Sequence, residues 1–544
     1  MKKEINMKSR EIKSLGVIVG IILLFSTMAM AQSSSQDVIQ HKIVSIDPMQ
    51  ITSWDKIPKG KIKSNDIEIP IRYIKNKNRI KQGIPAANII PKQEIDRSQI
   101  IQPTLTKSWD SLDNMANANL NGFFIRPPDP IIAAGQNHVG VMVNDVIAFY
   151  TKSGSLVTRA GLPNWYINIF NPCGTCFISD PRIVYDQNEN RWITVAEGID
   201  TSTSPWTTKY LLSVSKNSDP INGGWFLYSI PGNLNDNGIN TLADYPDLGF
   251  DGIQSTDSGG SGAIYITSNQ FDAAGNFVTA LLTILPKSVL YNGETITSLA
   301  QGYNLLNADG FRSDTLRVAT TYGNPGVEYF VNSENDGVNT NSNVMLRSID
   351  PRTLTLTEHA VPVGSFNPPP YAQQKQGGNT FLLDTIDNRM YNAVYRNGDV
   401  YAAFTEANNF GSGTVASIRY LALNVATNLY DLNIKYGADG KYYWFPAITT
   451  DNSNNIDIVF AYSSPTDYAG IRYTNKSAGQ VTTSPSTILK TGQVTIQGFR
   501  WGDYFGIAKD PTDNSIWIYG EYAKNLRGIS KVWDWGTFVG RVTN

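Results

Sequence analysis

The feature that most constrains the fold is a short motif that recurs along the chain. In each copy an apolar, strand-like run ends at Asp, Asn follows four residues later, and a second strand-like run begins. Asp and Asn favour turns because their side chains bond the nearby backbone. Each copy therefore predicts a hairpin between two strands. The four copies are PRIVYDQNENRWITV (Asp186, Asn190), TFLLDTIDNRMYNAV (Asp384, Asn388), PAITTDNSNNIDIVF (Asp451, Asn455) and FGIAKDPTDNSIWIY (Asp510, Asn514).

Three looser copies extend the repeat, with their turns at Gly135, Asp251 and Gly323. Successive turns are then separated by roughly 50 to 70 residues, and every unit has strand character only, a combination typical of a β-propeller. The sequence predicts an all-β fold, a β-propeller with seven blades as the favoured count. Eight blades are the alternative if residues 140 to 170 contain another unit. The last strand-like segment, KVWDWGTFVGRVTN, is expected to close the ring beside an N-terminal blade.

The two ends of the chain differ from the repeats. Residues 1–31 have a basic start, a short apolar stretch and an Ala-Met-Ala ending, as in a signal peptide. An uncleaved N-terminal anchor is the alternative. Residues 32–115 are rich in Lys, Ile, Gln and Pro and predict an irregular, extended lead-in, either a packed arm or a solvated linker. Residues 116–544 are assigned to the propeller.

Charge and composition limit the partners. The formal net charge is −2, and removal of the basic leader makes the chain more acidic, which argues against nucleic acid and anionic membranes. Only 17% of residues are charged, and 11% are aromatic, a composition typical of exported β-proteins, in which aromatic side chains fill the pleated faces of sheets. We expect an extracellular or cell-surface protein whose partner is a glycan or an extracellular protein. No membrane span is expected after signal cleavage.

Cys173 and Cys176, in NPCGTCF, are the only cysteines. In an oxidising compartment they predict a local disulfide. A thioredoxin-like redox pair is the alternative for a C-x-x-C spacing, but no βαβ pattern surrounds it. Zinc is not expected, because the scattered histidines and this pair offer no four-ligand spacing.

The hairpin motif also has a metal interpretation. Asp186, Asn188 and Asn190 alternate oxygen ligands as calcium loops do. The copies lack the Gly and terminal Glu of such loops, so an Asx turn explains them better. No cofactor or metal is predicted, and calcium is an alternative that is not favoured.

A second set of polar residues recurs at corresponding positions just before the first strand of several repeats. If these strands line the channel, their starts converge at one mouth, where carboxylates, guanidinium groups and aromatic rings could hold a sugar. The alternative is a set of fastenings between blades. In the first case Asp503→Asn reduces binding, and in the second it reduces stability. The predicted ligand-binding residues are Arg126, Asp129, Asp180, Arg182, Asp244, Tyr245, Arg500, Trp501, Asp503 and Tyr504.

Five segments together carry a resemblance that spans roughly residues 123 to 530: PPDP…AAGQNH, DPR…YDQNENRW, DYPDLGFD, LDTIDNRMYNAVYRNGDVYAA and WGDYFGIAKDP. The chain resembles a group of exported, largely uncharacterised propeller proteins similar to the sialidase (Asp-box) superfold. SKNSDPINGGWFLYS resembles a degenerate Asp-box. The resemblance implies the fold, but the sialidase arginine triad and Tyr–Glu pair have no counterparts that we can place. No G-x-S-x-G elbow supports a serine nucleophile either.

Three functions are therefore expected from the sequence, because fold alone does not decide among them. The first is binding of carbohydrate or a surface partner by a non-catalytic propeller. The second is degradation of a polysaccharide, as a hydrolase or lyase, at the channel mouth. The third is a structural role in the cell envelope or an extracellular assembly. Catalytic residues stay unassigned.

Overall fold

The structure is a computed structural model, and it divides the chain into units of residues 1–35 and 36–544. The predicted signal peptide lies outside the described residues, all of which belong to the second unit. None of the helices among them is long and apolar enough to cross a membrane. The described residues are 38–61, 66–69, 72, 90, 102–170, 176–236, 238–257, 262–334, 341–526 and 534–544.

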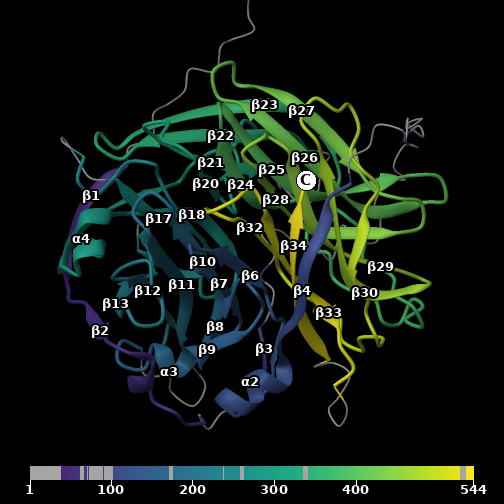
Figure 1. Cartoon of the computed structure of the whole chain (residues 1–544). Coiled ribbons are helices and arrows are strands. Elements are labelled where there is room, and N and C mark those ends of the chain that lie inside the picture. Colours follow the sequence, from purple (N-terminus) through teal and green to yellow (C-terminus); the bar gives the residue numbers. More distant parts are fainter. Residues whose placement is uncertain are drawn as a thin grey trace, which may run out of the picture. The chain divides into compact units, whose positions relative to one another are not determined.

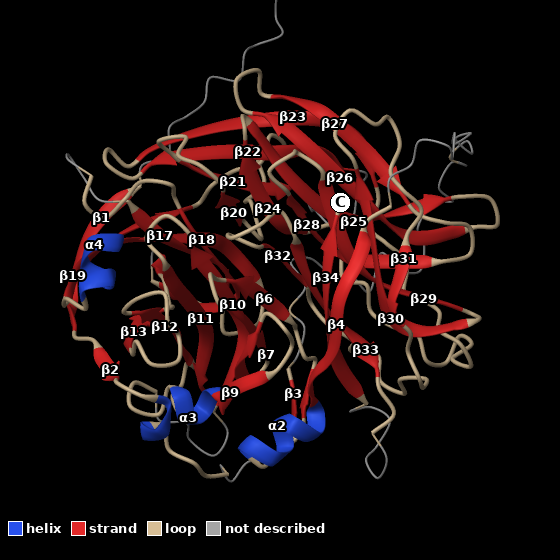
Figure 2. Ribbon diagram, viewed as in Figure 1, coloured by secondary structure: helices blue, strands red, loops and turns tan. Residues whose placement is uncertain are grey.

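Strands make up nearly all of the regular structure in the described residues (Figure 2). The predicted all-β class is confirmed. The described helical segments are short: η1 (Trp54–Lys56), α2 (Asn114–Asn121), α3 (Leu162–Trp165) and α4 (Lys287–Asn292).

The strands form successive antiparallel sheets in chain order. The first sheet contains β6 (Ile131–Ala134), β7 (His138–Val143), β8 (Val146–Thr151) and β9 (Leu156–Gly161). The second contains β10 (Phe177–Asp186), β11 (Arg191–Asp200), β12 (Thr207–Ser215) and β13 (Trp225–Pro231). The third contains β16 (Leu242–Phe250), β17 (Ala263–Phe271), β18 (Phe277–Pro286) and β19 (Ile296–Tyr303).

The next two sets of four strands are joined into one eight-stranded sheet, because β20 and β24 pair in parallel. One set is β20 (Arg317–Thr321), β21 (Glu328–Ser333), β22 (Asn341–Asp350) and β23 (Thr355–Phe366). The other is β24 (Met390–Arg396), β25 (Asp399–Asn409), β26 (Thr414–Asn424) and β27 (Leu429–Tyr436).

Two further sheets complete the series. One contains β28 (Tyr442–Thr450), β29 (Ile456–Ser464), β30 (Asp467–Lys476) and β31 (Thr487–Lys490). The other contains β32 (Gly506–Lys509), β33 (Ile516–Ala523), β34 (Trp535–Thr543) and β4 (Thr104–Asp113). Short pairs form between β3 (Ile67–Glu68) and β5 (Ile125–Arg126), and between β14 (Asn235–Asp236) and β15 (Ile239–Asn240).

The first strands of these sets contact one another in sequence order. The contacts run from β6 through β10, β16, β20, β24 and β28 to β32, and β32 contacts β6 again (Figure 1). We call these seven elements the first strands. Since each starts a new set, their starts come together at one end and their hairpins at the other.

Neighbouring sets are held together by apolar side chains. Trp192 of β11 is fully buried, and its ring meets Phe149 of β8 edge-to-face at a centroid distance of 5.0 Å. A Cβ atom at Gly140 of β7 would lie only 2.9 Å from the Trp192 ring, so glycine at this position makes room for it. Burial of such large aromatic surfaces dominates the energetics of a core.

The turn positions predicted from the repeat lie at hairpins of first strands, with one correction. Asp186, Asp451 and Asp510 lie at the hairpins that follow β10, β28 and β32. Asp384 does not: it lies in the loop before β24, and the hairpin that follows β24 is formed by Asn397 and Gly398, with φ of 53° and 96°. Asn-Gly suits a hairpin turn that needs positive φ at both residues. This dipeptide predicts the position of the turn better than the Asp–Asn spacing does.

The described parts of the lead-in include strands that pair with the repeats. β1 (Ile39–Ile46) pairs with β19, and β2 (Met49–Ile51) pairs with β13, each as a fifth strand. β4 pairs with β34, as expected for a C-terminal segment that pairs with an N-terminal one (Figure 1). This strand lies before residue 116, so the last sheet begins earlier in the chain than the predicted domain boundary.

Candidate functional site

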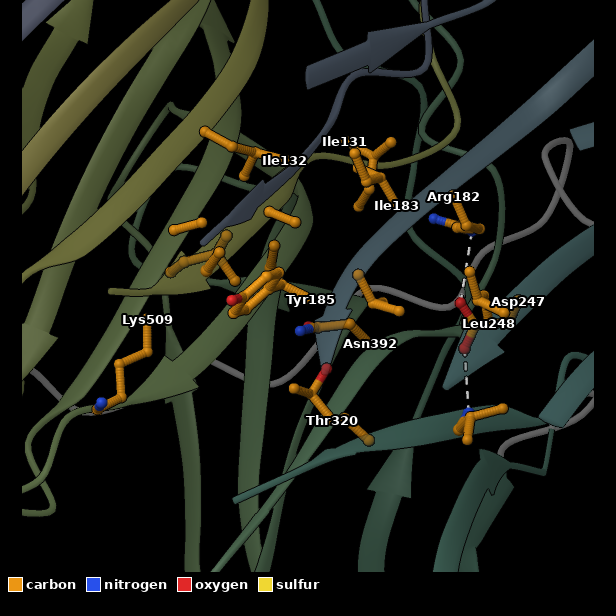
Figure 3. A pocket seen from close by; sticks show the side chains of 18 of the residues that line it. Ile131, Ile132, Arg182, Ile183, Tyr185, Asp247, Leu248, Thr320, Asn392 and Lys509 are labelled. Atoms are coloured by element: carbon orange, nitrogen blue, oxygen red, sulfur yellow. Dashed lines mark hydrogen bonds and ion pairs between the residues drawn. The ribbon is translucent and has the colours of Figure 1, made fainter. Parts of the chain in front are cut away.

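A cavity of about 80 Å³ runs between the first strands and has lining residues from all seven sets. Apolar side chains such as Ile131 and Leu248 line much of it, and Lys509 lies toward one side (Figure 3). Arg182 and Asp247 form an ion pair in the wall, with Arg182 Nε 3.4 Å from Asp247 Oδ1. Beyond this pair, at the strand starts, lies a buried group of charged residues.

The backbone at the strand starts adopts an uncommon conformation. Asp129, Asp180 and Tyr245 have φ values of 50°, 50° and 60°, and each precedes a proline. Non-glycine residues rarely adopt positive φ, and such strain persists only where the surrounding structure enforces it. Corresponding positive φ values occur before β20 and β24 and within β28, at Thr315, Ile386 and Phe445.

The structure brings three of the predicted acids together. Asp129, Asp180 and Asp503 each place a carboxylate oxygen within 4.8 Å of the other two. Asp129 Oδ1 accepts the backbone N–H of Asp503 at 2.8 Å, and Oδ2 accepts the Asn144 side-chain amide at 2.7 Å. Asn144 Oδ1 in turn accepts the N–H of Asp180 at 2.8 Å. These bonds join the first, second and last sheets.

Arg500 compensates one carboxylate of this inner group, Asp503. It donates to both oxygens of Asp503, with Nη2 2.6 Å from Oδ2, and to the carbonyl oxygens of Gly502 and Ile69. A bidentate pair of this kind is a strong charge-assisted interaction. Arg500 and Asp503 are 5% and 4% exposed. The Asp503 carboxylate is thus occupied within its own segment, whereas its backbone N–H and carbonyl oxygen bond to Asp129 and Tyr245 of other sheets.

Arg182 stacks on aromatic rings. Its guanidinium carbon lies 3.5 Å from the Tyr504 ring centroid, and its Nε donates to the carbonyl oxygen of Pro246 at 2.9 Å. The Tyr504 hydroxyl donates to Pro181, and the Tyr245 hydroxyl donates to Asp503, both at carbonyl oxygens. These contacts again link different sheets.

Other guanidinium groups near this point also have carboxylate partners. Arg317 Nη1 lies 3.3 Å from Asp247 Oδ1, which Arg182 also approaches. Arg389 pairs with Asp387 through two hydrogen bonds of 2.8 and 2.9 Å. The guanidinium carbons of Arg317 and Arg389 lie 4.4 and 4.7 Å from the ring centroid of Tyr245.

A second carboxylate group shares Asp180 with the first. Asp180, Glu197 and Asp244 each place an oxygen within 4.8 Å of the other two, and we call these three residues the acid trio. Glu197 is fully buried in β11, opposite Ser179. Arg72, from the lead-in, lies 3.3 Å from Asp244 Oδ1. The Arg72 and Asp244 side chains are 16% and 14% exposed, so the trio approaches solvent on this side.

Several carboxylate oxygens of the acid trio have no hydrogen-bond donor among the described residues. Both oxygens of Glu197 and Oδ1 of Asp180 are buried without a hydrogen-bond partner. Burial, followed by the charges of Asp244 and Asp180, raises the pKa of Glu197 well above its usual range. Burial, with Asp503 and Asp244, raises the pKa of Asp180 to about 7. The two carboxyl groups thus hold protons more tightly than exposed acids.

Two predicted residues lie apart from the acid trio. Arg126 pairs with Glu68 of β3 and belongs to the short β3–β5 pair. Trp501 is 3% exposed, and its indole N–H has no hydrogen-bond partner among the residues that the structure describes.

Sequence analysis missed the buried glutamates Glu197 and Glu521. Each lies near the end of the second strand of its set, eleven residues after a hairpin aspartate, Asp186 or Asp510. Both oxygens of Glu521 also lack a partner in the described part of the chain. The available signal was a lone Glu within an apolar strand, as in WITVAEG and IWIYGEY, because glutamate is almost never fully buried without a reason.

The hairpin aspartates have Asx-turn bonding. Asp186 Oδ1 accepts the N–H groups of Asn188 and Glu189 at 2.9 and 3.2 Å, and Oδ2 accepts the Tyr291 hydroxyl at 2.7 Å. Lys287 Nζ lies 2.9 Å from Oδ2. The favoured interpretation of this motif as an Asx turn is confirmed, since its carboxylate is fully occupied.

Cys176 is disulfide-bonded, whereas Cys173 lies outside the described residues. The predicted pairing of these two residues therefore stays a prediction.

Comparison with known proteins gives distant similarities only. No protein-family model matches the chain, and no curated protein matches it. Among solved structures, a protein of unknown function from Dyadobacter fermentans is 14% identical, with a TM-score of 0.38 over 69% of this chain and 96% of that one. The GH93 α-L-arabinofuranosidase of Fusarium graminearum is 10% identical, with a TM-score of 0.37 over 69% and 96% of the two chains. A Hadza microbial sialidase is 10% identical, with a TM-score of 0.33 over 76% and 64%.

Proposed function

We propose that this chain is an exported, seven-bladed β-propeller that binds a carbohydrate at the end of its central cavity where the first strands begin. Each set of four strands is one blade in this proposal, and β4 and β34 close the ring. The cyclic contacts of the seven first strands support the blade count. The basic and apolar leader of residues 1–31 supports export to the cell surface or the extracellular space.

The observation that carries the binding proposal is the unmet hydrogen-bonding capacity of the acid trio. Glu197 and Asp180 present oxygen atoms without partners in the described residues, next to the partly exposed Asp244. Buried polar groups are normally satisfied, and exceptions call for a ligand, water or ion. Sugar hydroxyl groups are donors that suit carboxylate acceptors.

Charge favours a neutral sugar or an amino sugar over a uronic or sialic acid. Arg500, Arg317 and Arg389 each face a carboxylate, at Asp503, Asp247 and Asp387. Arg182 shares Asp247, and Arg72 faces Asp244. A sugar carboxylate would therefore meet excess negative charge instead of an available arginine.

The test is a glycan array probed with the purified chain, followed by calorimetric titration of each ligand found. We expect neutral or amino-sugar oligosaccharides to bind and Asp244→Asn to weaken binding at least tenfold. Asp431→Asn, at an exposed strand position, is the matched control and should bind normally. Absence of any retained glycan, or equal binding by Asp244→Asn, contradicts the proposal.

Hydrolysis of a glycosidic bond is a second candidate function. The observation in its favour is the close approach of the Asp180 and Glu197 carboxylates, because retaining glycosidases use two carboxyl groups about 5–5.5 Å apart. Release of new reducing ends from neutral polysaccharides, lost in both Asp180→Asn and Glu197→Gln, would support it. Glycan binding without product would exclude it for the bound sugar.

A further inference from the structure

We infer that Asp180, Glu197 and Asp244 form a binding site for a calcium ion. The inference uses the same three residues as the carbohydrate proposal, and a bound ion would take the place of direct hydrogen bonds from sugar hydroxyls to these oxygens. Its test needs no sugar. The three residues come from β10, β11 and β16, thus from two neighbouring sheets. The three residues are not in one segment of the sequence, so a calcium-loop motif could not have predicted the site.

The spacing of the acid trio suits calcium. Each residue offers one oxygen within 4.8 Å of the oxygens of the other two. Calcium binds carboxylate oxygens at 2.3–2.6 Å, so two ligands of one ion lie at most about 5 Å apart. Magnesium demands near-ideal octahedral geometry and usually keeps several waters, which fully buried side chains such as Glu197 restrict. Calcium accepts a flexible geometry with several carboxylate ligands, so it is the cation that this buried trio favours.

The oxygens of the trio are available to a cation. Glu197 is 0% exposed and Asp180 is 2% exposed, yet three of their four carboxylate oxygens have no hydrogen-bond partner within the described part of the chain. A buried carboxylate without partners is costly unless a charge of opposite sign compensates it. The neighbouring group of Asp129, Asp180 and Asp503 differs, because Asp129 and Asp503 already bond to Asn144 and Arg500.

The backbone holds the trio in place. Asn144 fixes the N–H of Asp180, Glu197 pairs in register between Ser179 and Tyr210, and Asp244 pairs with Asn269. Ligands on paired strands are more rigidly placed than ligands on loops. Such a site needs little reorganisation to bind an ion.

Arg72 is the described cation that forms an ion pair with the trio, through Asp244. Arg182, Arg389 and Arg500 also act on Asp180 or Asp244 through space. Each of the three has a nearer carboxylate partner, at Asp247, Asp387 or Asp503, so negative charge is left over when the trio is ionised. A divalent ion would supply the balance, and Arg72 would weaken its binding by repulsion. Removal of the Arg72 charge should therefore tighten calcium binding.

The test is calorimetric titration of the chelator-treated full chain with calcium chloride, without sugar, together with thermal unfolding in calcium and in chelator. We expect one calcium ion per chain and a higher Tm in calcium. Magnesium should bind at least tenfold more weakly. Glu197→Gln and Asp244→Asn should each lose at least tenfold in affinity, and Arg72→Ala should gain about threefold to tenfold.

Glu521→Gln is the matched control, because Glu521 is an equally buried, partnerless glutamate at the same end of a second strand but outside the trio. It should bind calcium like the unaltered chain. The inference is overturned if the unaltered chain shows neither a heat of calcium binding in the titration nor a change in Tm between calcium and chelator. It is also overturned if both trio variants bind normally, or if Glu521→Gln loses binding equally. Glycan binding can fail while calcium binding succeeds, so the two proposals are tested separately.

Discussion

Buried carboxylates differ in their hydrogen bonding between the two ends of the first strands. At the hairpin end, Asp186, Asp251, Asp451 and Asp510 have both carboxylate oxygens occupied by backbone amides, side-chain donors or lysine. At the starting end, Glu197 and Glu521 have neither oxygen occupied by a described group, and Asp180 has one vacant.

The difference separates stability from binding capacity. A carboxylate whose partners are all internal contributes to folding and has nothing left for a ligand. A buried carboxylate without partners lowers stability, and it is retained where a ligand, ion or proton completes it. Asp503 lies at the starting end but is bonded like a hairpin residue, through Arg500.

The largest expected effect is the loss of a hairpin carboxylate. Asp186→Ala removes the 2.9 Å partner of the fully buried Lys287 ammonium and the acceptor for Tyr291, and leaves Lys287 with the more distant Asp251 carboxylate at 3.7 Å. Breaking a buried ion pair by removing one partner costs about 3–5 kcal/mol. Denaturant unfolding should show this loss. Asp272→Ala removes a similar turn carboxylate at the surface and should cost below about 1 kcal/mol; equal losses would break the comparison.

Asp457 is an exception near the hairpin end and gives a pH test. It is 1% exposed, and burial raises its pKa to about 7. Because the folded pKa exceeds the unfolded one, the stability linked to this group is complete below about pH 4 and is lost as pH rises through about 7. Asp457→Asn should remove about 2–3 kcal/mol of the decline in unfolding free energy between pH 5 and pH 8. An unchanged pH slope in the variant would show that Asp457 titrates normally.

Glu521→Gln tests the starting end without touching the acid trio. Burial and the charges of Asp129 and Asp503 raise the pKa of Glu521 well above its usual range. Its contribution to stability is therefore lost as pH rises through that raised pKa, and a neutral amide avoids the loss. We expect the unfolding free energy at pH 8 to increase by about 1–2 kcal/mol. A decrease of that size would mean that Glu521 has a stabilising partner.

The smallest effect concerns one hydrogen bond at the hairpin end. Tyr291→Phe removes the hydroxyl that donates to Asp186 Oδ2 at 2.7 Å, while Lys287 still pairs with that oxygen. The expected cost is about 1 kcal/mol, measured by denaturant unfolding. A loss as large as that of Asp186→Ala would show that the tyrosine, and not the lysine, is the main partner.

The repeat could be recognised in the sequence because the hydrogen bonds of a hairpin turn join residues that are close in sequence. Asp186 bonds to amides two and three residues away, so its role is written within one short segment. The same local pattern gave a wrong hairpin prediction at Asp384. This residue accepts the N–H of Ile386 in an Asx turn, but it lies before a strand and not at the end of one. Local bonding identifies a turn, and it does not say which strands the turn joins.

The sequence alone determined the all-β class and the hairpins at Asp186, Asp451 and Asp510, because each depends on a repeated local pattern. Only the tertiary structure decided which acids are satisfied. Arg500 occupies Asp503, whereas Glu197 lies buried beside Asp180 and Asp244 with no described hydrogen-bond donor. Partners across sheets are residues distant in sequence, and the register between neighbouring sheets is set by side-chain packing that no local spacing encodes.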